Sequence, residues 1–178
     1  VFYAHPYWTG HTFVEMTEVS GYLGVEVYNE VCQGANSGYG HVHWDQMLNK
    51  GYVLSGLATD DVHHSSAVGR AWTMIKAEKL DEKSILNALE NGCFYGTQGP
   101  VIEDFYVDEA LNAVVKCSAV RKIAFRCSGA GNGSVFKSQD ALGLTSAKWN
   151  LASKKAKWVR CEVTDENGNM AWTNPVFM

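Results

Sequence analysis

The chain places acidic and imidazole side chains directly after an apolar segment. The stretch Gly56–His64, GLATDDVHH, runs from apolar residues into two aspartates and two histidines. Residues i and i+2 of an extended backbone point to the same side, so Asp61 and His63 form a carboxylate–imidazole pair. Such mixed oxygen and nitrogen donors suit zinc, manganese or iron better than calcium. The pattern indicates a metal site at a strand end. The alternative is a polar loop in which Asp60 or Asp61 caps the segment that follows.

A second histidine follows another short apolar strand. His5 comes directly after the residues VFYA, and Pro6 ends that strand. Parallel α/β folds place their sites at the carboxyl ends of the strands. Two strand ends that are far apart in the sequence therefore carry histidine at what we expect to be the same edge. The alternative is a solvent-exposed loop histidine.

Further polar residues lie near these strand ends. Glu26 stands between apolar neighbours in the predicted strand GVEVYN, and a carboxylate there either faces solvent or is buried with a partner. Asn29 ends the same strand. Both could support metal ligands or contact substrate, or form an ordinary polar strand end. His41 and His43 form an H-x-H pair between a glycine-rich loop and a short helix, where surface exposure or substrate contact is the favoured interpretation.

The pattern of apolar residues changes near Gly96. Before it, strand-like and helix-like segments alternate. After it, the predicted elements are all strands, with turn signals at Asn132-Gly133 and Asn167-Gly168. We therefore expect an α/β part over residues 1–95 and an all-β part over residues 96–178. The expected strands are 1–4, 22–28, 52–59, 71–77, 113–117, 122–127, 157–163 and 170–177, and the expected helices are 12–19, 44–49 and 81–91.

Composition narrows the function classes. The chain has 178 residues, of which 46% are hydrophobic, and its formal net charge is -4. This balance gives no general attraction to nucleic acid or to an anionic membrane. No apolar run approaches the roughly 20 residues that span a bilayer. The five cysteines form no C-x-x-C pair, which favours free thiols in a reducing compartment, and hence the cytoplasm, over a disulfide framework.

Several short motifs occur in an order that resembles a known family. They are AHPYW (4–8), GVEVYN (24–29), WDQMLNKG (44–51) and LATDDVH (57–63). Together they resemble the C-terminal half of the PHP (polymerase and histidinol phosphatase) superfamily of metal-dependent phosphoesterases. The later stretches ALENGCFYGTQGP and WVRCEVTDENGNMAWTNPVF resemble the β-rich tail of one branch, which includes hydrolases of carbamate-type and related esters. The resemblance implies the C-terminal portion of a distorted (β/α)7 barrel, followed by a small antiparallel β-sandwich-like domain.

The resemblance also implies a chemistry. A complete site of this family would hold two or three manganese, zinc or iron ions and would act on a small-molecule phosphate or other ester. His5, Asp61 and His63 match metal ligands. Apart from the resemblance, Asp60 or a nearby histidine could relay a proton. Glu26 and Asn29 match a strand near the site that does not reliably supply ligands. The family's N-terminal H-x-H strand and its following Glu and His ligands have no counterpart upstream of Val1. We therefore expect a fragment with an incomplete site, of undetermined oligomeric state.

A second hypothesis comes from a different class. The chain could be a non-catalytic binding or assembly module whose β-rich half contacts a glycan or another subunit. Trp149, Trp158 and Trp172 would be the contacts if at least two of them were exposed together. The alternative is that these side chains pack in the core.

Overall fold

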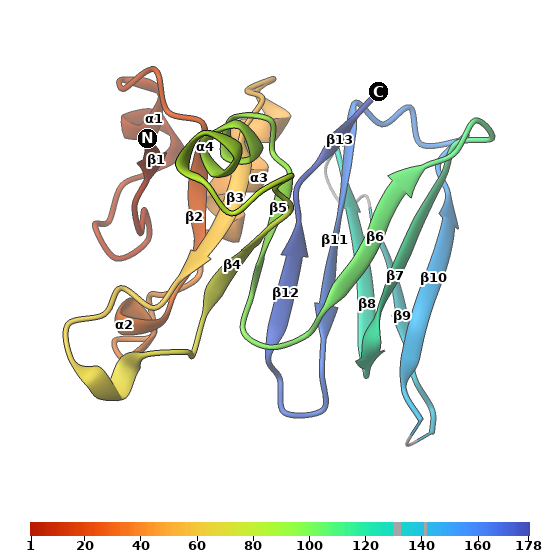
Figure 1. Ribbon diagram of the computed structural model, residues 1–178. Helices are drawn as coiled ribbons and strands as arrows, with labels where there is room; N and C mark the ends of the chain where they lie inside the picture. Colours follow the sequence, from red (N-terminus) through yellow and green to blue (C-terminus); the bar gives the residue numbers. More distant parts are fainter. Residues whose placement is uncertain (130–132, 141) are drawn as a thin grey trace. The chain divides into compact units, whose positions relative to one another are not determined.

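The computed structural model describes residues 1–129, 133–140 and 142–178. The chain divides into two compact units, Val1–Gly96 and Thr97–Met178. The boundary falls within one residue of the position where the sequence pattern changes. Each unit is described by itself below, with the element labels of Figure 1.

The first unit is organised around a small parallel sheet. Its strands are β1 (Phe2–Tyr3), β2 (Gly24–Asn29) and β3 (Ser55–Thr59), in the order β1-β2-β3. Every residue of β2 is buried, as expected for a central strand covered on both faces. At the carboxyl edge Asn29 is aligned with Thr59. The strand ends that the sequence singled out therefore lie at one edge of one sheet.

Short helices and one further strand pair complete this unit. Thr12 and Glu15 form the predicted capping box of the first helix, and Asp81 caps the last one through the amide of Ser84. The helix Glu30–Gln33 was not predicted from the sequence. The elements are α1 (Phe13–Thr17), α2 (Glu30–Gln33), α3 (His41–Asn49), the 3₁₀ helix η1 (Ser65–Ala67), β4 (Trp72–Ile75), α4 (Glu82–Glu90) and β5 (Phe94–Thr97), with β4 hydrogen-bonded to β5.

The second unit consists of antiparallel strands in two sets. Aromatic side chains from both sets meet: the Phe125 ring lies 6.5 Å from Phe105 and 6.0 Å from Trp149, between centroids. This packing agrees with the expected β-sandwich-like domain. One set runs β12 (Met170–Thr173), β11 (Trp158–Thr164), β8 (Lys122–Cys127) and β9 (Gly133–Lys137), with β13 (Val176–Phe177) also on β11. The other runs β10 (Leu144–Asn150), β7 (Asn112–Val120) and β6 (Ile102–Val107).

The two predicted turns have different outcomes. Asn167-Gly168 lies in the hairpin between β11 and β12, and Gly168 has a φ of +91°, which glycine adopts without strain. That prediction is confirmed. Asn132 of the other predicted turn lies outside the described residues.

The expected barrel portion is wrong. The chain is mostly β, with 39% of residues in strands and 17% in helices. A (β/α) barrel needs a crossover helix after each strand to return the chain parallel to its start. Here β3 is followed only by the three-residue helix η1 before β4. In the described part of the second unit, turns connect antiparallel strands. The barrel was implied by the resemblance alone. The apolar runs indicated the other strands but missed β5, β6, β9 and β10.

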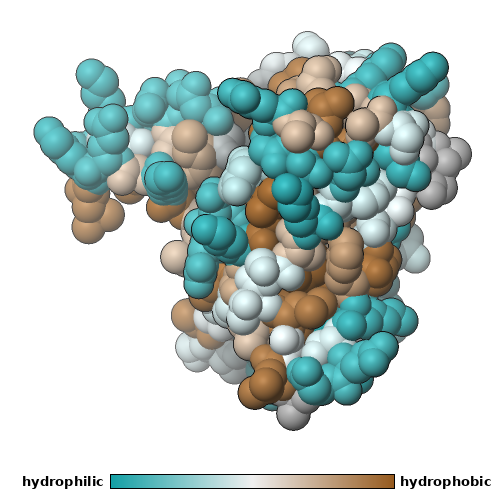
Figure 2. Space-filling view, turned by 90° about the vertical axis from the view of Figure 1, so that its right-hand side faces the viewer, coloured by the Kyte–Doolittle hydropathy of each residue, from teal (hydrophilic) through white to brown (hydrophobic). Residues whose placement is uncertain are grey.

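The tryptophans expected to serve a binding module do not gather on the surface. Trp158 and Trp172 are buried and Trp149 is half-buried. The face in Figure 2 shows hydrophilic side chains interspersed with smaller hydrophobic areas. The module hypothesis required at least two of these tryptophans to be exposed together, and this condition is not met.

None of the helices in the described ranges has the length and apolar character of a membrane span.

Close packing at Gly56 yields a stability prediction. The Trp44 ring is fully buried, its Nε1 donates to the Leu54 carbonyl at 2.8 Å, and a Cβ added at Gly56 would lie 2.6 Å from that ring. We expect Gly56→Ala to lower the free energy of unfolding of the first unit by about 1–3 kcal/mol, measured by urea titration. The control Ser55→Ala should change it by less than about 0.5 kcal/mol. Equal effects of the two variants would contradict this packing.

Candidate functional site

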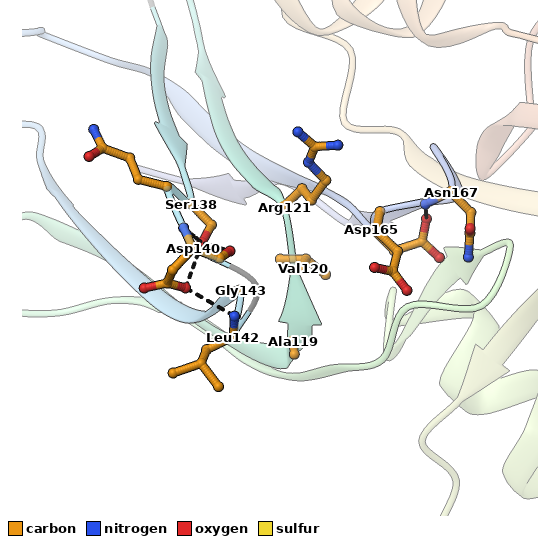
Figure 3. Close-up of a pocket in the computed structure, with 11 residues that line it drawn as sticks. Ala119, Val120, Arg121, Ser138, Asp140, Leu142, Gly143, Asp165 and Asn167 are labelled. Atoms are coloured by element: carbon orange, nitrogen blue, oxygen red, sulfur yellow. Dashed lines mark hydrogen bonds between the residues drawn. The ribbon is translucent and has the colours of Figure 1, made fainter.

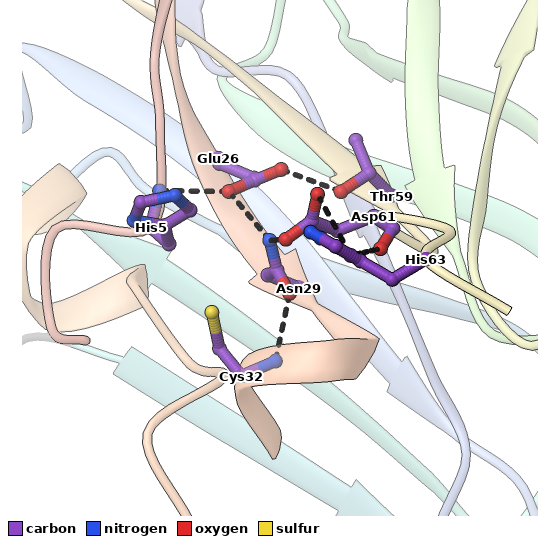
Figure 4. A network of polar contacts seen from close by, with 7 residues as sticks. All are labelled: His5, Glu26, Asn29, Cys32, Thr59, Asp61 and His63. Atoms are coloured by element: carbon purple, nitrogen blue, oxygen red, sulfur yellow. Dashed lines mark hydrogen bonds and ion pairs between the residues drawn. The ribbon is translucent and has the colours of Figure 1, made fainter. Parts of the chain in front are cut away.

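Polar side chains gather at the carboxyl edge of the parallel sheet. Three strands end there, and the residues that follow each of them turn toward the same region, as Figure 4 shows. Parallel strands bring their carboxyl ends together, so residues distant in the sequence become neighbours. The participants are His5, Glu26, Asn29, Cys32, Thr59, Asp61 and His63.

The carboxylate of Glu26 connects the three strand ends. Glu26 is 7% exposed, and its Oε2 accepts hydrogen bonds from the His5 amide at 2.7 Å and from Asn29 Nδ2 at 3.1 Å. Its Oε1 accepts from the Thr59 hydroxyl. A buried carboxylate is costly unless donors compensate it, and three donors do so here. Glu26 thereby fixes the loop after β1 and the end of β3 against β2.

Asn29 extends this network to the candidate ligands. Its side chain is fully buried, and Nδ2 also donates to Asp61 Oδ2 at 3.2 Å. Its Oδ1 accepts from the Cys32 amide at 2.9 Å and so caps α2. Asn29 therefore helps to fix the orientation of the Asp61 carboxylate.

Two of the predicted ligands have unusual backbone conformations. His5 has a φ of +26° and Asp61 a φ of +53°. Non-glycine residues rarely adopt positive φ, and such strain clusters at functional sites. The hydrogen bonds of the Glu26 network hold both positions. These outliers support a functional hypothesis for the ends of β1 and β3.

The predicted ligands differ in how their donor atoms are used. His5 Nδ1 is buried and has no hydrogen-bond partner among the residues that the structure describes. His63 Nδ1 lies 2.6 Å from the Asp61 carbonyl oxygen and 3.9 Å from Asp61 Oδ1. The two side chains are therefore adjacent, with His63 Nδ1 turned to the Asp61 backbone carbonyl. Over the ranges described, no three His, Cys, Asp or Glu residues form a group that could hold a metal ion.

Asp60 holds a loop. Its two oxygens accept hydrogen bonds from the backbone amides of Gly69, Arg70 and Ala71, at 2.6, 2.8 and 2.6 Å. These bonds close the segment that carries Asp61 and His63. This geometry favours a structural role for Asp60 over the proton relay that was expected from the sequence.

The H-x-H pair does not form a shared site. His41 and His43 lie in the first turn of α3, where residues i and i+2 do not face each other. The two rings have different neighbours, since His41 lies beside Tyr39 and His43 beside Tyr7. Burial lowers the pKa of His43 because it disfavours the imidazolium. The helix thus separates two side chains that the sequence places close together.

Sequence reasoning missed two members of the network. Thr59 directly precedes Asp60 at the end of β3, so its position at a strand end was an available signal. Cys32 gave no signal, because α2 was not predicted. Burial, and then the charges of Asp61 and Glu26, raise the pKa of the Cys32 thiol to about 11. The thiol is therefore protonated near pH 7 and is a poor nucleophile.

A separate hollow is lined by other residues. It has a volume of about 580 Å³ and lies in the second unit around Arg121, as Figure 3 shows. Two of its acidic side chains accept hydrogen bonds within their own turns: Asp140 Oδ1 accepts from the Leu142 amide, and Asp165 Oδ1 accepts from the amides of Asn167 and Asn169. None of the residues singled out from the sequence as ligands lines it. The strand-end network remains the better candidate.

Comparison with known proteins adds no assignment. No family model matches the sequence, and no curated protein or solved structure matches it. Arguments about function therefore rest on the site itself.

The role of Asp60 can be tested by hydrogen exchange. We expect Asp60→Ala to speed amide exchange at residues 69–71 by about tenfold or more, because three hydrogen bonds to a carboxylate are lost. Asp60→Asn keeps one acceptor oxygen and should show a smaller effect. Unchanged exchange in Asp60→Ala, measured by mass spectrometry, would contradict the loop-holding role.

The burial of the Cys32 thiol can be tested by its reactivity. All five cysteines are free, and Cys93 alone among them is exposed. We expect iodoacetamide at pH 7 to label Cys93 first and to leave Cys32 unmodified. Labelling of Cys32 should increase as the pH rises toward its raised pKa, because only the thiolate reacts. Peptide mass mapping measures both sites, and Cys93→Ser is the control that removes the fast reaction. Rapid labelling of Cys32 at pH 7 would contradict its burial.

Proposed function

We propose that the protein is a divalent-metal-dependent hydrolase of a small-molecule ester, with its ion at the carboxyl edge of β1, β2 and β3. Asp61, His63 and His5 would hold the ion. The observation that carries the proposal is the Glu26 network, which ties the ends of three parallel strands together and holds His5 and Asp61 at positive φ.

The donor chemistry of this edge fits such an ion. It combines a carboxylate with imidazoles, as zinc, manganese and iron prefer. His5 Nδ1 is buried and has no hydrogen-bond partner within the described part of the chain, so it is available as a ligand atom. Because these side chains do not form a three-ligand group, binding requires them to move closer together.

The remaining residues of the network would orient the ligands. Asn29 Nδ2 holds Asp61 Oδ2, and the Glu26 carboxylate holds both Asn29 and the His5 backbone. Such outer hydrogen bonds fix the geometry of ligands and raise their basicity. A bound divalent ion lowers the pKa of a water ligand and polarises an ester oxygen, which is the chemistry that hydrolysis needs.

The adjacent residues His63 and His64 allow a test of metal binding with a matched control. The intact chain should bind Zn²⁺ or Mn²⁺ near one equivalent in an equilibrium titration. We expect His63→Ala and Asp61→Ala to weaken this affinity by about tenfold to a hundredfold, because each removes a donor. His64→Ala removes an exposed histidine outside the network and should leave the affinity unchanged.

The same titration can contradict the proposal. Equal affinities in His63→Ala and His64→Ala would place any bound ion elsewhere. Absence of binding by the intact chain would remove the basis for metal-dependent hydrolysis at this edge.

A further inference from the structure

Two lysines of the second unit lie directly opposite each other on neighbouring strands. Lys122 begins β8 and Lys137 ends β9, and the antiparallel register aligns them. On the other side of β8, the register aligns Lys122 with Thr164 of β11. Aligned residues of paired strands present their side chains to the same face of a sheet. Lys137, Lys122 and Thr164 therefore form one row across three strands.

The two lysines lack a counter-charge that other cations of this unit possess. Like charges in directly opposite positions destabilise a sheet. Within the described part of the chain, neither Lys122 nor Lys137 forms an ion pair. Both ammonium groups are therefore available to an external anion. The matched cations are Arg126, 3.6 Å from a Glu162 oxygen, Lys148, 3.5 Å from an Asp108 oxygen, and Lys116, aligned with Asp104.

The row of side chains borders a hollow of about 330 Å³. Its lining includes Arg121, Lys122, Lys137 and Thr164. The Thr164 Oγ1 atom is buried and has no hydrogen-bond partner among the residues described, and such an atom is a common sign of an absent water or ion. The Arg121 amide donates to the Thr164 carbonyl and the Ser138 amide donates to the Arg121 carbonyl, both at 2.9 Å. The hollow thus combines three cationic side chains with an unused hydroxyl on a fixed backbone.

Two carboxylates also line this hollow, but only one of them is open. Asp165 Oδ1 accepts from the amides of Asn167 and Asn169, at 2.9 and 2.8 Å, and its Oδ2 accepts from Asn169 Nδ2 at 3.0 Å. These donors compensate the charge of Asp165. Glu166 is exposed and forms no ion pair with any described residue. The open cations outnumber this one open carboxylate, so the hollow favours an anion.

We propose that this hollow binds a doubly charged tetrahedral oxyanion, such as a phosphate group, between Lys122 and Lys137. Each ammonium group donates a charge-assisted hydrogen bond to the anion, and the bound negative charge relieves the repulsion between the lysines. The larger hollow of Figure 3 shares Arg121 and Glu166 with this one, which leaves room for the organic part of an esterified anion. Such a site binds without reacting, and its residues are separate from those proposed to hold the metal.

Titration of the intact chain with inorganic phosphate tests the site. At mildly alkaline pH, the backbone amide NMR signals of Lys122, Lys137 and Thr164 should shift saturably. Lys122→Gln and Lys137→Gln should each weaken the phosphate affinity by about threefold to tenfold, because each removes a charge-assisted hydrogen bond. Glu166→Gln should strengthen it by about twofold, because a like charge is removed. The control Lys116→Gln removes an exposed lysine outside the hollow and should have no effect.

Salt and a second ligand complete the experiment. Added sodium chloride should weaken phosphate binding, because it screens exposed charges. Glycerol phosphate that binds at least as tightly as phosphate would identify an esterified anion as the ligand, whereas binding of inorganic phosphate alone would identify the free ion.

Two outcomes would overturn the proposal. They are the absence of saturable shifts in the intact chain and an unchanged phosphate affinity in the double variant Lys122→Gln, Lys137→Gln. The lysines would then serve only to keep β9, the edge strand of its sheet, from pairing with another chain.

Discussion

The Glu26 carboxylate is the constraint on which the first unit depends. A charge buried in the middle of a parallel sheet is tolerated only when donors surround it. Those donors come from the loop after β1, from the end of β2 and from the end of β3. The same hydrogen bonds that compensate the charge therefore fix the relative positions of three strand ends. Removing any one donor would leave the buried Glu26 carboxylate less compensated. The positions of the three strand ends therefore depend on one another.

This constraint explains why strained backbone persists at the site. His5 and Asp61 occupy positive φ, which costs free energy, and each is held through a hydrogen bond to the network. Asp60 adds a second anchor by accepting three amides from the loop that follows. Rigid support of this kind is what a ligand set needs, because donor atoms must be positioned before an ion or substrate arrives.

Features that depend on neighbouring residues were predictable from the sequence. The capping box at Thr12 and Glu15, the cap at Asp81 and the turn at Asn167-Gly168 involve side chains within a few residues of one another. The barrel expectation failed because it needed long-range information. A run of apolar residues predicts a strand, but strand pairing and direction follow from contacts between distant segments. Several strands, among them β9 and β10, alternate weakly between apolar and polar residues and were not recognised.

The sequence by itself determined which chemical groups follow the strands: a histidine after β1, a carboxylate and an asparagine in β2, and an Asp-x-His pair after β3. Local chain direction was enough to place them at strand ends. Only the tertiary structure decided how they are used. It made Glu26 the centre of the network, engaged Asp60 with backbone amides and separated His41 from His43 on a helix. The physical reason is that a hydrogen bond or a ligand set requires specific distances between atoms, and the packing of distant segments sets those distances.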